Sequence, residues 1–170
     1  MSVHSLQGAA LTDAAAIAVG KSAPMLVCNH GIKKFSTYHV GFYCDVCGEA
    51  QDKGSIMFGC RKCDYDQCLK CHDAAMALMA RVDAVFDMFD LDGDEYLCKP
   101  EYRSYVRNVE GAVYLDEQWD ELWERLSIKH DFQPSIGMSK VKFRLIYREH
   151  IAHLDAHEQS CGLSPRADTD

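Results

Sequence analysis

Three Cys-x-x-Cys pairs between residues 44 and 71 constrain this chain more than any other feature. The pairs are Cys44/Cys47, Cys60/Cys63 and Cys68/Cys71. A two-residue spacer lets both thiols of a pair point at one metal ion, and tetrahedral zinc needs four cysteine or histidine ligands. Three pairs supply six ligands, which is more than one zinc needs and two fewer than two zincs need. Cys28 and His30 lie just upstream and complete the count, so the sequence predicts two closed Zn²⁺ sites.

A disulfide scaffold is the alternative reading of so many cysteines, and the sequence argues against it. The chain has nine cysteines, an odd number. Its first residues, MSVHSLQGAALTDAAAIAVG, lack the basic stretch and the uninterrupted apolar run of a secretory signal. Thiols kept inside the cell stay reduced and bind zinc. We therefore expect an intracellular, cytoplasmic protein; a cytoskeletal or organellar assembly stays open as its location.

The charge of the chain narrows the class of partner. The formal net charge is −8 at pH 7. Nucleic acid and anionic membrane surfaces select for lysine and arginine, so neither is the expected partner. No stretch approaches the ~18 consecutive apolar residues that a membrane-spanning helix needs. The expected partner is a protein or peptide, within a larger complex or outside one.

The order of the motifs predicts four segments and a mainly α fold with a small zinc-stabilised β module. Residues 1–23 form an N-terminal extension and residues 24–73 the two-zinc module. Residues 74–154 form a helical unit, and residues 155–170 a C-terminal tail. Residues 55–58 have the character of a strand and suggest a hairpin that holds the cysteine pairs.

The segments CDVC and CRKCDYDQCLKC resemble a ZZ-type zinc finger, and similar spacing occurs in C1-like fingers. The resemblance implies a cross-braced arrangement, in which the first and third cysteine pairs share one zinc. Cys60 and Cys63 would share the other zinc with a further pair, which in ZZ fingers is two downstream histidines. Here Cys28 and His30 are the expected substitutes, with His39 or His72 as alternatives to His30.

The same resemblance implies a peptide-binding role for three aspartates. Some ZZ fingers capture the free amino terminus of a peptide with carboxylates, and Asp45, Asp64 and Asp66 stand at the matching positions. A cluster of carboxylates beside a rigid turn suits an ammonium group. The alternative is that Asp66 caps the backbone amides of a turn while Asp45 and Asp64 face water.

Residues 73–90 predict a long helix, with apolar residues at helical spacing and no linker after the zinc module. It leads into residues 90–101, DLDGDEYLCKPE, which resemble an EF-hand calcium loop. The resemblance implies one Ca²⁺ with oxygen ligands from loop positions 1, 3, 5, 7 and 12. These are Asp90, Asp92, Asp94, the Tyr96 carbonyl and bidentate Glu101. Position 6 is usually glycine because the turn needs a positive φ, but here it is Glu95.

EF-hands occur in pairs, and the second one here has lost its ligands. Residues 116–130 predict a helix, and aligning its apolar residues with those of the first hand places the second loop at residues 131–142. Positions 3 and 5 are Gln133 and Ser135. Position 12 is Lys142, whose ammonium replaces the bidentate glutamate, so this loop should not bind calcium. The fold class that results is a cross-braced two-zinc finger followed by a four-helix EF-hand pair.

The last predicted helix continues through His150, His153 and His157. His153 and His157 would share one helix face and could hold a metal, although a solvated helix end is the commoner outcome for such histidines.

The sequence contains no recognisable catalytic motif: no His-Glu-x-x-His, no phosphate-binding glycine loop and no Gly-x-Ser-x-Gly. We therefore expect a non-catalytic zinc- and calcium-binding adaptor that mediates protein–protein interaction. The alternative is a constitutive structural subunit that uses both metals only for stability, and a hydrolase ranks a distant third.

Overall fold

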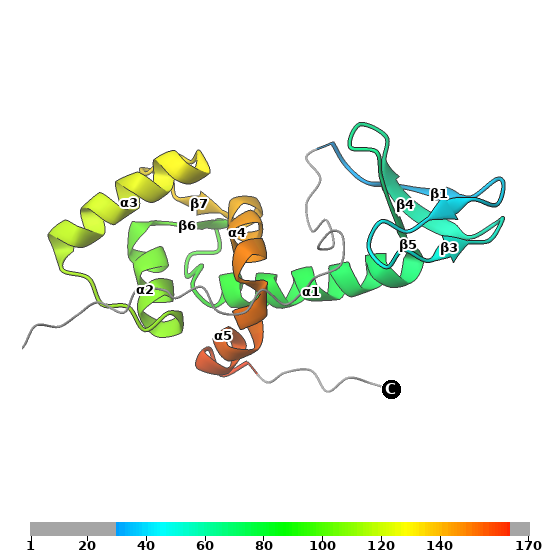
Figure 1. The fold of residues 1–170 in the computed structure, drawn as a ribbon. Helices are drawn as coiled ribbons and strands as arrows, with labels where there is room; N and C mark the ends of the chain where they lie inside the picture. The colour runs from blue at the N-terminus through cyan, green and yellow to red at the C-terminus, as the bar shows by residue number, and fades with distance from the viewer. Residues whose placement is uncertain (1–29, 164–170) are drawn as a thin grey trace, which may run out of the picture.

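The computed structural model describes residues 30–163, which form a β module and a helical body joined by one helix (Figure 1). The expected N-terminal extension 1–23 and the candidate ligand Cys28 lie outside the described residues. About half of the described chain is helical, and the strands are short. None of the described helices is long and apolar enough to cross a lipid bilayer.

The β module contains two small antiparallel sheets. Strands β1 (Lys33–Ser36), β4 (Ile56–Cys60) and β5 (Tyr65–Cys68) form the first sheet in the order β1-β4-β5. Strands β2 (Phe42–Tyr43) and β3 (Ala50–Gln51) form the second. The predicted strand character of residues 55–58 is confirmed, because β4 is the central strand. Its Met57 is fully buried, and so is Gln67 of β5. These two central positions give the small module a core.

Helix α1 (Leu69–Asp87) begins four residues before the predicted start at residue 73. Cys68 is its N-cap in an extended conformation, so strand β5 runs directly into the helix and Cys71 lies in its first turn. The helix also ends before the predicted residue 90. The N–H groups of Phe89 and Asp90 both donate to the carbonyl of Phe86, which turns the chain into the loop that follows.

The helical body contains two helix–loop–helix units whose loops pair with each other. Their elements are β6 (Tyr96–Leu97), α2 (Lys99–Val109), α3 (Asp116–His130), β7 (Met138–Ser139) and α4 (Lys140–Tyr147). The helix predicted over residues 116–130 is confirmed with those bounds. Strands β6 and β7 are antiparallel, and Leu97 stands opposite Met138. Both side chains are fully buried, so the two loops are locked together at this point.

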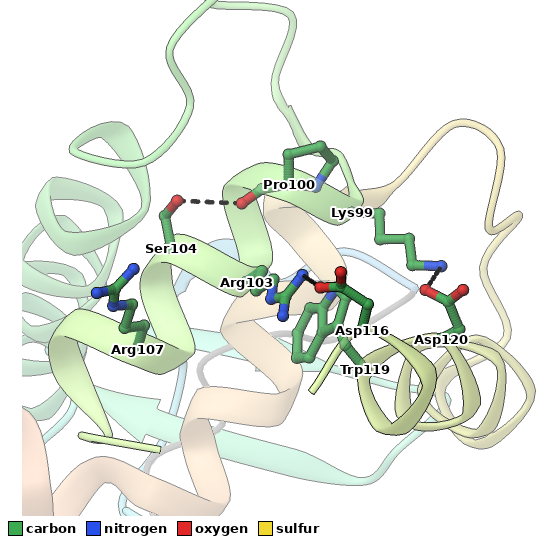
Figure 2. A pocket seen from close by; sticks show the side chains of 8 residues that line it. All are labelled: Lys99, Pro100, Arg103, Ser104, Arg107, Asp116, Trp119 and Asp120. Atoms are coloured by element: carbon green, nitrogen blue, oxygen red, sulfur yellow. Dashed lines mark hydrogen bonds and ion pairs between the residues drawn. The ribbon is translucent and has the colours of Figure 1, made fainter. Parts of the chain in front are cut away.

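An aromatic core holds the helices of this body together. Phe86 of α1 packs edge-on against Phe143 of α4, with ring centroids 5.4 Å apart, and Tyr105 of α2 packs against the same ring at 5.2 Å. Trp119 and Trp123 of α3 are almost fully buried. Outside the core, two ion pairs tie α2 to α3: Arg103 with Asp116, and Lys99 with Asp120 (Figure 2).

The end of the chain differs from the predicted continuous helix. After α4 the chain forms a 3₁₀ helix, η1 (Arg148–His153), and then the short helix α5 (Leu154–Ser160). All of α5 except Leu154 lies in the expected tail, residues 155–170. The break lets α5 pack on α1 and α2. Leu154 is buried in the core, and the carboxylate of Glu158 accepts hydrogen bonds from Arg81 of α1. These tertiary contacts replace the regular continuation of α4.

Candidate metal centres

The first cysteine cluster gathers four thiols from three parts of the β module. Cys44 and Cys47 lie between β2 and β3, Cys68 ends β5, and Cys71 lies in α1. Their sulfur atoms are all within 4.8 Å of one another. Four ligands at the zinc–sulfur distance of about 2.3 Å would stand about 3.8 Å apart in a tetrahedron. The cluster therefore has the donor set and the compactness of a closed zinc site.

Backbone hydrogen bonds favour the thiolate at the centre of this cluster. The N–H of Cys68 donates to Sγ of Cys44 at 3.3 Å. Burial alone would raise the pKa of Cys44, but the backbone N–H groups around it lower that pKa from 9.0 to about 7. The pKa of Cys71 is raised, first by burial and then by its contacts with the other thiols of the cluster. Four neighbouring thiols resist simultaneous ionisation, and a divalent cation is what relieves that conflict.

The second cluster consists of His30, Cys60 and Cys63, whose ligand atoms also lie within 4.8 Å of one another. Nδ1 of His30 is 3.3 Å from Sγ of Cys63. These three side chains are donors of the kind that zinc takes, and the fourth predicted ligand, Cys28, lies outside the described residues. The two groups interleave along the sequence, since the first and third cysteine pairs meet while the second pair meets an upstream histidine.

The two alternative histidines have other partners. His72 stacks on Phe58 with ring centroids 3.5 Å apart, and its Nδ1 lies 2.7 Å from the side-chain amide of Gln67. Nδ1 of His39 donates to the carbonyl of Val40. Neither belongs to a metal-ligand group of the described residues. His30 is therefore the histidine that the fold brings to Cys60 and Cys63.

The loop over residues 90–101 gathers three carboxylates at its centre. Oxygen atoms of Asp90, Asp92 and Asp94 lie within 4.8 Å of one another. Backbone N–H groups of the loop hold these side chains: Glu95 donates to Asp90 at 3.1 Å and Tyr96 donates to Asp94 at 2.8 Å. Oxygen ligands at 2.3–2.6 Å from one cation can be separated by up to about 5 Å, so the spacing fits a hard divalent ion.

Glu101 has a more structural position than the sequence indicated. Its two carboxylate oxygens accept hydrogen bonds from the N–H groups of Leu91, at 2.9 Å, and Cys98, at 2.8 Å. It closes the loop at both ends and is not part of the three-aspartate group. Burial opposes its ionisation, but the side chain and N–H of Cys98 and the N–H of Leu91 lower the pKa of Glu101. Tyr96 lies in β6, opposite Ser139 of the second loop.

Glu95 confirms the backbone conformation expected at the sixth loop position. Its φ is +66°, in the left-handed region that favours glycine. A non-glycine residue there costs about 1–2 kcal/mol. The loop therefore retains a strained residue where glycine would adopt the same turn freely.

The second loop is closed by an ion pair within itself. Nζ of Lys142, at the twelfth position, lies 3.3 Å from a carboxylate oxygen of Asp131, at the first position. The carbonyl of Pro134 accepts a hydrogen bond from the indole of Trp123 at 3.1 Å. Within the described residues, no group of three potential ligands forms in this loop. An ammonium group thus joins the two ends of the loop that a cation joins in an EF-hand.

The three aspartates expected to hold a peptide amino terminus have unequal surroundings. Asp45 accepts the backbone N–H of Asp66 at 2.6 Å, and the carboxylate of Asp66 pairs with Arg61. Asp64 is exposed, with a positive φ of 48°. The three carboxylates do not all lie within 4.8 Å of one another. Asp45, which the alternative placed in water, therefore accepts a backbone amide, and Asp66, its expected cap, forms an ion pair instead. Only the exposed Asp64 matches the alternative.

The histidines near the C-terminus contribute to packing. His157 is half-buried, and its Nδ1 contacts the hydroxyl of Tyr147. The rings of His153 and His157 stack with centroids 6.1 Å apart, but the two histidines join no metal-ligand group among the described residues.

No protein-family model, curated protein or solved structure matches this chain. The functional reading therefore depends on the geometry of the three clusters. Sequence reasoning missed one neighbour of these clusters, the pair of Arg61 and Asp66 above Gly59. The sequence feature that goes with this pair is Gly59, two residues before Arg61, because a side chain at position 59 would overlap both Arg61 and Asp66.

Proposed function

We propose that this protein is a non-catalytic adaptor that holds two zinc ions and one calcium ion and binds a protein or peptide. The observation that carries the proposal is the pairing of the two loops. Leu97 and Met138 are the eighth residues of their loops, and they face each other in the β6–β7 ladder. That register is expected of an EF-hand pair. In this chain the first loop is acidic, and the second has an ion pair between its first and twelfth residues.

The proposed zinc ions have a structural role. The β module is small, and the buried residues of its two sheets do not amount to the large aromatic core of the helical body. In modules of this size, zinc binding and folding are one equilibrium. Cys44, Cys47, Cys68 and Cys71 would hold the first ion; His30, Cys60 and Cys63 would hold the second with Cys28. A site closed by four protein ligands leaves no open position for a substrate, which supports a non-catalytic role.

The proposed calcium ion would be held by Asp90, Asp92 and Asp94, with the Tyr96 carbonyl and Glu101 as the remaining oxygen ligands. When bound, the ion would neutralise the carboxylates that the loop gathers. Glu101 supports this role because its hydrogen bonds already fix its carboxylate between the two ends of the loop. A single active loop beside an ion-paired one supports simple binding of one ion rather than a cooperative switch.

Counting metals in the intact protein tests the proposal directly. Native mass spectrometry should find two zincs and one calcium per chain. Glu101→Gln should remove the calcium, because it removes a charged ligand and keeps the size of the side chain. Lys142→Gln, in the second loop, is the matched control and should leave the count unchanged. One zinc, or a second calcium, would show that the assignment is wrong.

A peptide amino terminus is the proposed ligand of the aspartates beside the first cluster. Asp64 is the residue to test, because Asp45 and Asp66 also hold the turn. A peptide library with free amino termini should bind, and acetylation of the peptides should abolish binding because it removes their positive charge. Asp64→Asn should weaken the binding of free peptides. Equal binding of free and acetylated peptides would exclude this mode.

The second candidate function is a structural subunit in which both metals serve stability alone. The Lys142–Asp131 ion pair favours it, since a loop closed without metal does not respond to calcium. The two functions differ in one measurement. In an adaptor that responds to calcium, the ion should change the binding of an apolar dye to the helical body. A structural subunit should bind the dye equally with and without calcium.

A further inference from the structure

The β module carries a groove whose charge is opposite to that of the chain as a whole. The groove has a volume of about 480 Å³. Its lining includes His30 and Cys60 of the second cluster. The rest comes from the segment that leads into β1, from β1 itself, from the end of β4 and from the turn that follows: Gly31, Lys33, Lys34, Phe35, Gly59, Arg61 and Lys62. No acidic residue among the described residues lines it. The chain carries a net charge of −8, yet this groove presents four cationic side chains.

The cations are not equally free to bind a ligand. Arg61 pairs with Asp66, and its guanidinium stands over the ring of Phe35 at 5.0 Å. Lys33, Lys34 and Lys62 are exposed, and none of them takes part in an ion pair within the described residues. Three lysines without an ion pair among the described residues therefore line the groove, and Arg61 is held on Phe35 by its pair with Asp66.

The fold keeps the groove open at Gly59. Lys33 of the edge strand β1 stands opposite Gly59 of β4. A side chain at position 59 would overlap the Arg61–Asp66 pair. Glycine at this position allows the ion pair to lie over the strand and Arg61 to reach Phe35. The position of the cation thus follows from one missing side chain.

Another cleft on the molecule pairs two of its three cationic side chains with acidic residues, and the third, Arg107, has no ion pair among the described residues. Between α2 and α3, Lys99 pairs with Asp120 and Arg103 pairs with Asp116, each at 2.7 Å (Figure 2). These two ion pairs join α2 to α3. In the groove on the β module, none of the three lysines has an acidic partner among the described residues. Their positive charge is therefore available to an external ligand.

We propose that this groove binds an acidic peptide segment of a partner protein, an inference that rests on the proposed adaptor function and names the chemistry of its partner. Carboxylate side chains would pair with the lysines, and the methylene groups of the peptide would pack on Phe35. Lysines on an edge strand also discourage aggregation, but that role does not require a groove or a stacked arginine. A nucleic acid is the less favoured ligand, because a long polyanion would extend past the groove onto an acidic molecule.

Fluorescence anisotropy with an N-acetylated, fluorescein-labelled octaglutamate tests the proposal on the full chain with its metals. Acetylation keeps the probe from binding as a free amino terminus. The groove variant is Lys33→Glu with Lys34→Glu. The matched control is Lys53→Glu with Lys129→Glu, two exposed lysines outside the groove whose replacement changes the net charge equally. Octaglutamine is the neutral probe.

The groove variant should raise the Kd for octaglutamate by about tenfold, because two attractions become repulsions. The control variant should change the Kd by less than about twofold, and octaglutamine should not bind. Binding should weaken between 50 and 300 mM salt, through the shorter screening length. An equal loss of affinity for octaglutamate in the two variants would show that the groove is not the binding site. Tighter binding of an octathymidylate than of octaglutamate would show that the ligand is not an acidic peptide.

Metal counts on the same samples separate this inference from the proposed function. A chain with two zincs and one calcium that does not bind octaglutamate refutes the groove alone. A chain with fewer metals refutes the function on which it rests. The groove variant must retain both zincs, and this measurement shows that β1 remains folded beside His30.

Discussion

The contact between Arg81 and Glu158 should be the strongest polar interaction between α1 and α5. Nε and Nη2 of Arg81 donate to the two carboxylate oxygens of Glu158 at 3.0 and 2.7 Å. Glu158 is only 4% exposed. Hydrogen bonds to Glu158 raise the pKa of Arg81, and burial, which lowers it, has the smaller effect. The guanidinium is therefore charged at every relevant pH. The perturbation to test is Arg81→Met, which keeps the apolar stem and removes the charge.

The expected cost follows from what remains after the change. Removing one partner of a buried ion pair leaves an uncompensated charge and costs about 3–5 kcal/mol. The side chain of Arg81 is 32% exposed, so water can reach the vacated position, and we expect a value near the lower end, about 3 kcal/mol. Asp155, the other partner of Arg81, is 84% exposed and should contribute less than about 1 kcal/mol.

Urea denaturation followed by tryptophan fluorescence measures this loss. The chain has two tryptophans, Trp119 and Trp123, and both lie on α3, so the signal reports the helical body. A loss of about 3 kcal/mol corresponds to a fall of about 10 °C in the melting temperature. Asp155→Asn is the control for the exposed partner. Arg81→Met with Glu158→Leu should recover most of the stability, because no buried charge remains. If the double variant is as unstable as Arg81→Met, the ion pair is not the cause.

Three further predictions concern the metal cluster, the strained loop and pH. Cys68→Ser should leave one zinc per chain by native mass spectrometry, since only the first cluster loses a ligand. Glu95→Gly should stabilise the chain to heat by about 1 kcal/mol, because glycine adopts the φ of +66° without strain; a calorimetric scan would contradict this by showing a lower melting temperature. Burial, with His153 and His150, lowers the pKa of His157 from 6.5. The unfolded chain then binds that proton more readily, so stability is present above pH 6.5 and is lost as pH falls below it. His157→Gln should flatten this fall in urea midpoints measured from pH 7 to about pH 5.

The sequence predicted those parts of the fold that depend on local patterns. The helix at residues 116–130 has an apolar face and ends where Asp131 takes a left-handed conformation. The cysteine grouping followed from ligand arithmetic together with the family resemblance, and the positive φ of Glu95 followed from the turn that a twelve-residue loop requires.

Features that depend on distant contacts could not be predicted in the same way. The partners Arg81 and Glu158 are far apart in the sequence, and no local pattern relates them. The break after Tyr147 contains no proline or glycine; it arises because α5 turns back to pack on α1. The open groove depends on which side chain stands opposite Gly59, and this required the strand register.

Helix α1 determines the angle between the β module and the helical body (Figure 1). It carries Cys71 in its first turn and the fully buried Val82 and Val85 further along. Its 19 residues extend about 28 Å, and each residue advances the helix by about 100°. One residue inserted between Cys71 and Val82 would therefore rotate the module by about 100° relative to the helical body. The number of residues in this segment therefore fixes the relative orientation of the β module and the helical body. Any ligand that contacted both parts at once would require that number.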